Sequence, residues 1–162
     1  MIGNDVVDLA LAQIESNWRR TGFISKIFTD KEQKLIRTYH NPELIIWNLW
    51  SRKEAVYKIY NRETGIRAFI PQELECLYSN DYEGQVLCKG KYYYTKTTKE
   101  NDFLHSIAVT DESHFDLITC VDEQQTIVKK EGIPFIHCNY SHELLPVSIS
   151  HHGRYYKAIT IK

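Results

Sequence analysis

The sequence predicts an α+β fold in which one long helix packs on a mainly antiparallel sheet. One long helical stretch covers residues 42–60, and short β-branched and aromatic runs follow it between turn signals. With 162 residues, of which 43% are hydrophobic, the chain is long enough to bury one good core. We therefore expect residues 1–162 to form a single domain.

Composition argues against several classes of protein. A formal net charge of −1 does not suit a bulk nucleic-acid binder, and 25% charged residues are typical of soluble proteins. No apolar run approaches about 18 residues, and Asp5 and Asp8 stand where a signal peptide would be basic and then apolar. The four cysteines are widely spaced without a C-x-x-C pair, which indicates reduced thiols. We expect a cytoplasmic protein that binds neither nucleic acid nor membranes.

The first predicted element is a strand over Ile2–Leu9 that passes into a helix near Asp8. Asp8 is a suitable N-cap for a helix over Leu9–Asn17, which is a structural role. Asp5 is different, because it lies inside a strand that should be buried, where an unpaired carboxylate is costly. Asp5 is therefore expected to have a cation as its partner.

The long helix carries charges where a core helix should be apolar. Asn41 is a good N-cap and Pro42 suits the first helical position. At 3.6 residues per turn, one stripe of the helix holds Trp47, Trp50, Glu54 and Lys58. An exposed i,i+4 ion pair would explain Glu54 and Lys58, but two tryptophans on the same stripe favour burial, which requires a cation for the carboxylate. A metal would satisfy both Glu54 and Asp5.

The segment after the helix is expected to be rich in strands. Gly65 stands where the helix should end. Strands are expected over Leu74–Tyr78, Gln85–Lys89, Lys91–Thr97, Phe103–Val109 and Phe115–Val121, with a hairpin around Gly90. Tyrosines of that hairpin could stack on bases and its lysines could hold phosphates, although exposed strand residues are the simpler interpretation. Glu123–Glu131 is interpreted as a connector, and His105 and His114 as surface or satisfied core histidines.

The last segment is expected to carry a strand that ends in a polar turn. Pro146–Tyr155 begins with a strand-like alternation and then presents Ser150 and His151 at a turn around Gly153. Hydroxyls, imidazoles and the backbone amides of a glycine turn can together hold an anion. By itself this segment is a weak indication of an anion site.

Three segments of the chain resemble the 4'-phosphopantetheinyl transferase superfamily. They are Gly3–Leu9 (GNDVVDL), Ile27–Glu32 (IFTDKE) and Trp50–Lys58 (WSRKEAVYK). Their order and separation are similar to those of the short holo-(acyl-carrier-protein) synthase type, which also has an acid three positions after Asp5. Farther along, Ser148-Ile-Ser150-His151 resembles the family's S-x-S-H element.

This resemblance implies an enzyme that moves the 4'-phosphopantetheine group of coenzyme A to a serine of an apo acyl or peptidyl carrier protein. The product 3',5'-ADP leaves, and fatty-acid, polyketide or nonribosomal peptide pathways are the implied setting. The resemblance further implies Asp5 and Glu54 as Mg²⁺ ligands, and Glu54 and Lys58 as catalytic residues. It implies that Lys58, Ser150 and His151 contact coenzyme A.

Two features depart from the short type. Many more residues separate Lys58 from Ser148 than in the short synthases. This intermediate length is compatible with the homotrimer of the short type and with the monomer of the longer, two-lobed type. Leu11 stands where the short type usually has a basic residue that docks the carrier, so Arg19 and Arg20 are candidates for that role.

Two alternatives to group transfer remain open at this point. One is a non-enzymatic α+β module whose Tyr/Lys hairpin binds an acidic partner. The other is a metal-dependent hydrolase that uses Asp5, Glu54 and His151. In the transferase interpretation, Lys58 should matter more for activity than Lys53, which points toward a different stripe of the helix.

Overall fold

The computed structural model describes residues 1–162 except 101, 123–124 and 139–142. The described α-helices are α1 (Leu9–Glu15), α2 (Phe23–Ile27), α3 (Asp30–Thr38) and α4 (Pro42–Thr64), and two 3-10 turns cover Pro71–Glu73 and Glu112–Leu117. The described strands are β1 (Ile2–Asp8), β2 (Leu74–Tyr78), β3 (Glu83–Cys88), β4 (Lys91–Glu100), β5 (Phe103–Val109), β6 (Ile118–Cys120), β7 (Ile127–Lys130), β8 (Ile133–His137), β9 (Leu144–His152) and β10 (Tyr155–Ile161).

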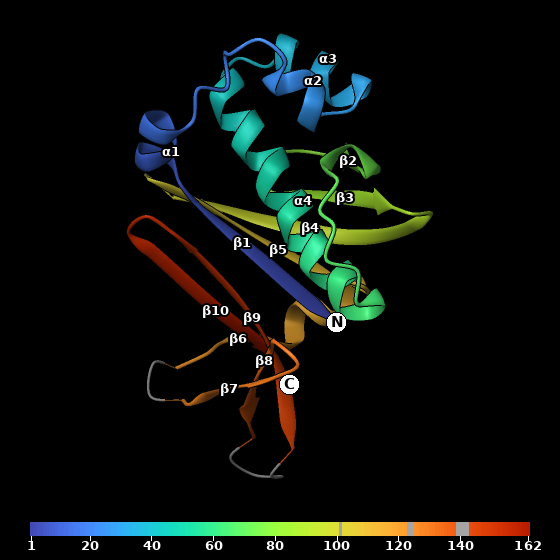
Figure 1. The fold of residues 1–162 in the computed structure, drawn as a ribbon, viewed down its shortest axis with the longest axis vertical. Coiled ribbons are helices and arrows are strands. Elements are labelled where there is room, and N and C mark those ends of the chain that lie inside the picture. Colours follow the sequence, from blue (N-terminus) through green and yellow to red (C-terminus); the bar gives the residue numbers. More distant parts are fainter. Residues whose placement is uncertain (101, 123–124, 139–142) are drawn as a thin grey trace.

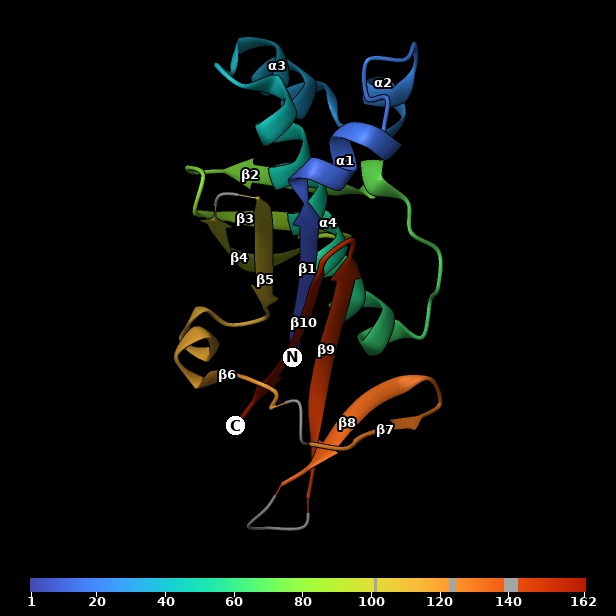
Figure 2. The same ribbon diagram turned by 90° about the vertical axis from the view of Figure 1, so that its left-hand side faces the viewer.

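These strands form two antiparallel sheets. The first has the order β1-β5-β4-β3-β2 and the second the order β6-β10-β9-β8-β7. Helix α4 lies along one face of the first sheet, and α1, α2 and α3 gather at one end of the molecule (Figure 1). The view turned by 90° shows β9 and β10 running beside β1 (Figure 2). The predicted α+β class, with a long helix on a mainly antiparallel sheet, is confirmed.

Helix α4 begins where the sequence predicts and continues one turn beyond its expected end. The Asn41 side chain accepts a hydrogen bond from the amide of Leu44 at 3.1 Å, and Pro42 occupies the first turn. Gly65 ends the helix with a φ of 73°, in the left-handed region that favours glycine. The helix therefore starts and stops on local signals, and most of its middle is buried.

Strand β1 lies very close to the backbone of α4. A Cβ atom at Gly3 would overlap the carbonyl oxygen of Ala55, so only glycine permits this approach. The first glycine of the G-x-D segment thus brings β1 against the helix. As a result, the side chain of Asp5 in β1 can reach the same space as the polar stripe of α4.

The free edge of β1 is closed by side chains of β9. Alternate backbone amides of β1 each donate to a side chain of β9, at 2.9, 2.9 and 2.8 Å. The donor and acceptor pairs are Asn4–Ser148, Val6–Ser150 and Asp8–His152. We call this set the side-chain ladder. The side-chain ladder joins the two sheets without backbone pairing between β1 and β9. It gives hydrogen-bond acceptors to backbone amides at the edge of β1 that would otherwise lack them.

The structure corrects two expectations about the strands. Phe115–Leu117 belongs to the 3-10 turn, whose start is capped by the Asp111 side chain, so the strand is shorter than Phe115–Val121. The presumed connector Glu123–Glu131 contains β7, which pairs with β8, while residues 123–124 lie outside the described residues. Both errors arise because pairing partners, rather than the local pattern, decide where these short strands form. Helix α1 also ends at Glu15, before Asn17.

Two compositional expectations can be compared with the structure. Cys76, Cys88 and Cys120 are free thiols in the structure. In the part of the chain that the structure describes, no helix combines the length and the apolar character needed to cross a membrane.

Candidate active site

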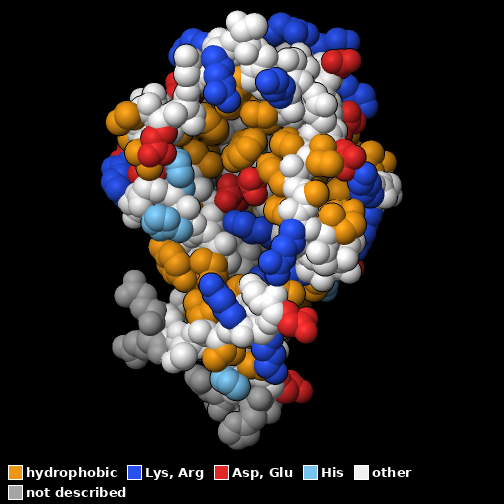
Figure 3. Space-filling view, viewed as in Figure 1, with side chains coloured by type: hydrophobic (Ala, Val, Ile, Leu, Met, Phe, Trp, Pro, Cys, Tyr) orange, Lys and Arg blue, Asp and Glu red, His pale blue; other side chains and the backbone are white. Residues whose placement is uncertain are grey.

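A cavity of about 600 Å³ lies between α4, β1 and the end of β9. It is lined by every residue that the sequence placed at the site, namely Asp5, Glu54, Lys58, Ser150 and His151, and by both tryptophans of the α4 stripe. Acidic side chains lie deep in this hollow, with apolar side chains on one side and Lys or Arg on the other (Figure 3). Its volume is within the usual range for small-molecule sites.

Asp5 is held from two sides. Its Oδ1 accepts a hydrogen bond from the Ser150 hydroxyl at 2.8 Å and lies 3.3 Å from the Lys58 ammonium. Burial raises the pKa of Asp5, and Lys58 and Ser150 oppose that rise. Among the described residues, nothing donates a hydrogen bond to the other oxygen, Oδ2. Asp5 therefore has a fixed orientation and one oxygen available for a ligand.

Glu54 is the acid of the cavity that has no protein partner among the described residues. Within the described residues its carboxylate makes no hydrogen bond and no ion pair, although much of the side chain is shielded from water. Burial, together with the negative charge of Asp5, raises the pKa of Glu54 to about 7, against the opposing effect of Lys58. A shielded carboxylate without a partner is costly, so this position favours a bound cation.

The donor set of the two acids fits a hard divalent cation. Mg²⁺ prefers oxygen ligands and commonly keeps only one or two carboxylates, with waters and substrate oxygens in its other positions. Among the described residues, no three His, Cys, Asp or Glu side chains are grouped in a way that could hold a metal. Asp5 and Glu54 would therefore hold such a cation as a pair, which does not match the three-ligand hydrolase with His151.

Lys58, in α4, forms hydrogen bonds with both strands that line the cavity, β1 and β9. Its ammonium donates to the carbonyl of Asn4 at 2.7 Å, to the carbonyl of Ile149 at 3.2 Å and to Asp5. It thus links β1, β9 and α4, and its side chain is still 28% exposed toward the cavity. The remaining accessible face leaves a positive charge beside the acid pair.

Ser150 and His151 lie in strand β9, and the prediction that they sit at a turn is wrong. The hairpin turn comes later, at Gly153 and Arg154, because His152 already pairs with the first residue of β10. The hydroxyl of Ser150 is occupied by the amide of Val6 and by Asp5. His151 is exposed and lines the cavity, so it remains the accessible member of the predicted pair.

Asp8 has a structural role, as its position predicted. Its Oδ1 caps α1 by accepting from the amides of Ala10 and Leu11. Arg154 donates to both carboxylate oxygens from its side chain, at 2.9 Å each, and holds the pKa of Asp8 well below its usual range. The amide of Arg154 also binds Asp8, so the backbone of this glycine turn holds an internal carboxylate.

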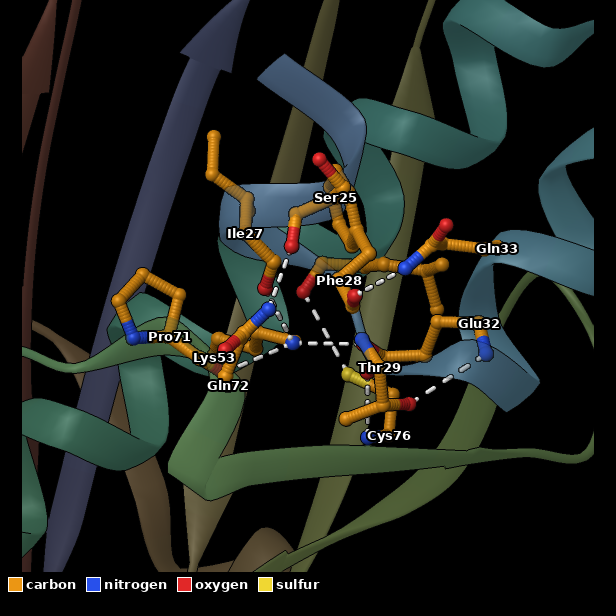
Figure 4. Close-up of polar contacts among 11 residues, drawn as sticks. Ser25, Ile27, Phe28, Thr29, Glu32, Gln33, Lys53, Pro71, Gln72 and Cys76 are labelled. Atoms are coloured by element: carbon orange, nitrogen blue, oxygen red, sulfur yellow. Dashed lines mark hydrogen bonds and ion pairs between the residues drawn. The ribbon is translucent and has the colours of Figure 1, made fainter. Parts of the chain in front are cut away.

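The buried ion pair of Glu32 and Lys53 lies beneath the other face of α4 (Figure 4). Thr29 and Glu32 form a capping box at the start of α3, and Glu32 accepts from Lys53 at 2.6 Å. Lys53 also donates to the carbonyls of Ile27 and Pro71, at 3.0 and 2.9 Å. The other Glu32 oxygen accepts from the amide of Cys76 at 2.7 Å. The F-T-x-x-E segment thus joins α3, α4 and β2.

The sequence did not single out part of the apolar wall of the cavity. Ala12, Ser16, Phe23 and Ile27 line it, together with Arg20. Ala12 lies in α1, Ser16 and Arg20 lie in the connection that follows it, and Phe23 and Ile27 lie in the short helix α2. Arg20 was proposed from the resemblance for a different reason, the absence of a base at Leu11, and it does face the cavity.

His105 is a satisfied histidine, as expected from its isolated position. Its Nε2 lies 3.1 Å from the side-chain amide nitrogen of Asn4. Burial lowers its pKa to about 4, with smaller contributions from Lys157 and Lys58. The imidazole is therefore neutral at physiological pH and supports β1 rather than carrying charge.

Fold and cavity together define an α+β protein with a half-buried acid pair suited to a divalent cation. The sequence model described as the 4'-phosphopantetheinyl transferase superfamily matches residues 1–110. The chain belongs to the 4'-phosphopantetheinyl transferase superfamily. This confirms the resemblance drawn from three motifs, all of which lie in the matched part. Ser150 and His151 lie beyond it.

Two relatives found by sequence comparison are holo-[acyl-carrier-protein] synthases. The chain is 36% identical over 73 residues to a holo-[acyl-carrier-protein] synthase of Caldanaerobacter subterraneus. The aligned region covers 45% of this chain and 56% of that protein. It is 28% identical over 109 residues to the synthase of Fusobacterium nucleatum, which covers 67% of this chain and 86% of that protein. The chain thus spans little more than half the length of the Caldanaerobacter relative.

Solved structures show the same fold at low sequence identity. The holo-[acyl-carrier-protein] synthase of Neisseria meningitidis has a TM-score of 0.56 at 17% identity, covering 68% of this chain and 97% of that chain. The holo-[acyl-carrier-protein] synthase of Thermotoga maritima has a TM-score of 0.52 at 18% identity, and the match covers 80% of this chain and 77% of that chain. The Helicobacter pylori synthase, solved in complex with coenzyme A, also scores 0.52, at 17% identity, covering 67% and 98%.

Proposed function

We propose that this protein transfers the 4'-phosphopantetheine group of coenzyme A to a serine of an apo acyl or peptidyl carrier protein. The observation that carries the proposal is the meeting of Asp5, Glu54 and Lys58 in one cavity. Family membership and the names of the relatives support it. We further propose that residues 1–162 act as one domain in this reaction.

In this proposal Asp5 and Glu54 would hold Mg²⁺, and the pyrophosphate of coenzyme A would bind in the same cavity. Mg²⁺, when bound, neutralises charge on the pyrophosphate and on the departing 3',5'-ADP. Lys58 supplies a second positive charge, and Ser150 keeps Asp5 in orientation. His151, at the exposed edge of the cavity, is proposed to donate a hydrogen bond to the same ligand.

The proposed step is a displacement at phosphorus. The serine hydroxyl oxygen of the carrier bonds to the β-phosphorus of coenzyme A, and the bond from that phosphorus to the bridging oxygen breaks. The bond's electron pair leaves with 3',5'-ADP, and the serine proton passes to Glu54, either directly or through a water molecule. Trp47, Trp50 and Phe23 form the apolar wall of the cavity, which limits access of water that would compete with the serine.

A direct assay tests the proposal. The protein is incubated with coenzyme A, Mg²⁺ and a panel of apo-carriers, and the carriers are weighed by mass spectrometry. We expect one carrier to gain the mass of 4'-phosphopantetheine, with release of 3',5'-ADP, and a chelator to abolish the gain. Lys58→Met should weaken the reaction sharply.

Other outcomes would favour the alternatives. Zinc-dependent hydrolysis of coenzyme A without carrier modification would indicate a hydrolase. Failure to bind coenzyme A with any divalent cation, together with binding of an acidic protein partner, would indicate a binding module. Either result would overturn the proposed transfer reaction.

A further inference from the structure

Asn4 is a buried polar residue of β1 whose role the candidate site does not explain. It lies between Gly3 and Asp5 in the G-x-D segment, and its side chain is shielded from water. A buried amide side chain is costly unless its polar atoms have partners, so its contacts indicate its role. Those contacts come from β5, β9, β10 and α4.

The two backbone groups of Asn4 are bound by side chains of other elements. Its amide donates to the Ser148 hydroxyl at 2.9 Å, and its carbonyl accepts from the Lys58 ammonium at 2.7 Å. The other acceptors of Lys58 in the described part of the chain are farther away, the Ile149 carbonyl at 3.2 Å and Asp5 at 3.3 Å. The Asn4 carbonyl is therefore the main anchor of the Lys58 ammonium.

The side-chain amide of Asn4 fixes the residue from its other end. Its Nδ2 donates to the carbonyl of Lys157 in β10 at 3.1 Å, and it lies 3.1 Å from Nε2 of His105 in β5. A carbonyl can only accept, so the amide atom that faces Lys157 is the nitrogen. The same nitrogen faces His105, whose Nε2 must therefore be an unprotonated acceptor. Each of the two amide hydrogens thus has its own acceptor.

The charge state of His105 agrees with this assignment. Its pKa of about 4, lowered by burial and then by Lys157 and Lys58, leaves the imidazole neutral at physiological pH. A protonated imidazole would direct a donor at the Asn4 amide and add positive charge near Lys58. Geometry and charge therefore indicate the same tautomer, with the proton on Nδ1.

Building on the proposed function, we infer that Asn4 and His105 are positioning residues that fix the ammonium of Lys58 in the active site. His105 holds the side chain of Asn4, and the carbonyl of Asn4 holds Lys58. Neither Asn4 nor His105 is among the described residues that line the cavity, so both act on a ligand through Lys58. A lysine ammonium on its flexible stem has no fixed direction, so a rigid acceptor decides where its charge lies.

The test is a double-mutant cycle of Asn4→Ala and Lys58→Met, measured as transfer per folded molecule with coenzyme A, Mg²⁺ and the carrier found in the direct assay. Asn4→Ala should lower kcat about tenfold to a hundredfold, the loss expected for a group misplaced by about 1 Å. The double variant should lose no more than Lys58→Met, because Asn4 acts through Lys58.

Two substitutions of His105 test the first contact of this arrangement. His105→Gln should keep most of the transfer activity, because its amide oxygen can accept from Asn4 near the position of Nε2. His105→Leu has no acceptor, so it should lower kcat as Asn4→Ala does. This rescue by glutamine separates the hydrogen bond from the volume of the side chain.

The matched control is Asn48→Ala, on α4. Asn48 is also buried, its Nδ2 donates to the carbonyl of Asp81 at 2.8 Å, and its Oδ1 lacks a partner among the described residues, as does Oδ1 of Asn4. Both substitutions should lower stability, because each leaves a buried carbonyl with one donor fewer. Only Asn4→Ala should lower kcat per folded molecule.

The contradicting outcomes are separable. If wild type transfers the group and the losses in the cycle are additive, Asn4 is a structural residue and the proposed function stands. Equal losses in His105→Gln and His105→Leu would also overturn the inference. If wild type transfers nothing, the proposed function fails, and the same cycle measured by urea unfolding decides whether Asn4 positions Lys58. Non-additive free energies of unfolding would support that coupling, and additive ones would overturn it.

Discussion

Lys53 and Glu54 are neighbours on α4, but only the charge of Lys53 has partners within the described part of the protein. The ammonium of Lys53 is fully buried and uses all three of its donors, on Glu32 and on the carbonyls of Ile27 and Pro71. Glu54 turns to the other side of the helix, faces the cavity and has no partner among the described residues. The protein itself supplies every partner of the Lys53 ammonium, whereas the Glu54 carboxylate is accessible to a ligand in the cavity.

This contrast shows why burial alone does not identify a catalytic residue. A buried charge whose every hydrogen bond is made within the protein holds elements together, as the Glu32–Lys53 pair does for α3, α4 and β2. A shielded charge without a partner lowers the stability of the unliganded protein. In the proposed function, the cation bound in the cavity would account for the unpaired charge of Glu54.

The largest expected effect is the loss of transfer activity in the variants Asp5→Asn and Glu54→Gln. Each variant removes a negative charge that the cation needs, and Glu54→Gln also removes the proton acceptor, so transfer should fall about 10²- to 10⁴-fold. Circular dichroism should show both variants folded. Near-normal transfer in either variant would remove that residue from the site, whereas loss of folding would assign it a structural role.

The reverse pattern is expected for Lys53→Met. Leaving Glu32 buried and unpaired should lower the free energy of unfolding by about 3 to 5 kcal/mol, measured by urea titration. The expectation that Lys53 matters less than Lys58 for activity stays a prediction, because the contacts of Lys53 concern stability. Transfer per folded molecule should change little, and adding Glu32→Gln should recover part of the stability.

A matched control for Lys53→Met is Lys31→Met. Lys31 also forms an ion pair, with Glu75 at 2.8 Å, but its side chain is 75% exposed. Loss of an exposed pair should cost no more than about 1 kcal/mol. Equal losses in the two variants would contradict the structural role assigned to the buried pair.

The local signals of the chain account for what the sequence could predict. Asn41, Pro42 and Gly65 determine both ends of α4 through contacts within a few residues, and the spacing of a helix then puts Glu54 and Lys58 on one face. Asp5 was identifiable because a carboxylate inside a buried strand is unusual. These features required no knowledge of distant parts of the chain.

Other features could not be predicted, because they depend on distant partners. The burial of Lys53 requires Glu32, which lies 21 positions earlier in the chain. Ser150 lies in a strand because β9 pairs with β10 and its side chain closes the edge of β1, which lies 144 positions away.

A smaller effect is expected for Ser150→Ala, with Ser148→Ala as its matched control. Both substitutions remove one acceptor from the side-chain ladder and leave a buried amide unpaired, so each should cost about 1 to 3 kcal/mol of stability. Only Ser150 also donates to Asp5. Ser150→Ala alone should therefore raise the Mg²⁺ concentration needed for half-maximal transfer. An equal shift for Ser148→Ala would show that the effect is structural.

The most direct test of the contrast on α4 is the pH dependence of unfolding for wild type and Glu54→Gln, in chelator. The folded-state pKa of Glu54, about 7, lies above the ordinary value of 4.5 for a glutamate side chain. Between these values the folded state binds more protons than the unfolded state, so wild-type stability should fall as pH rises through this window. At pH 8 Glu54→Gln should be more stable, by no more than about 3 kcal/mol. The advantage should vanish near pH 4 and shrink when Mg²⁺ is added at pH 8. A Glu54→Gln variant less stable than wild type at pH 8 would show that Glu54 is satisfied within the fold, as Lys53 is.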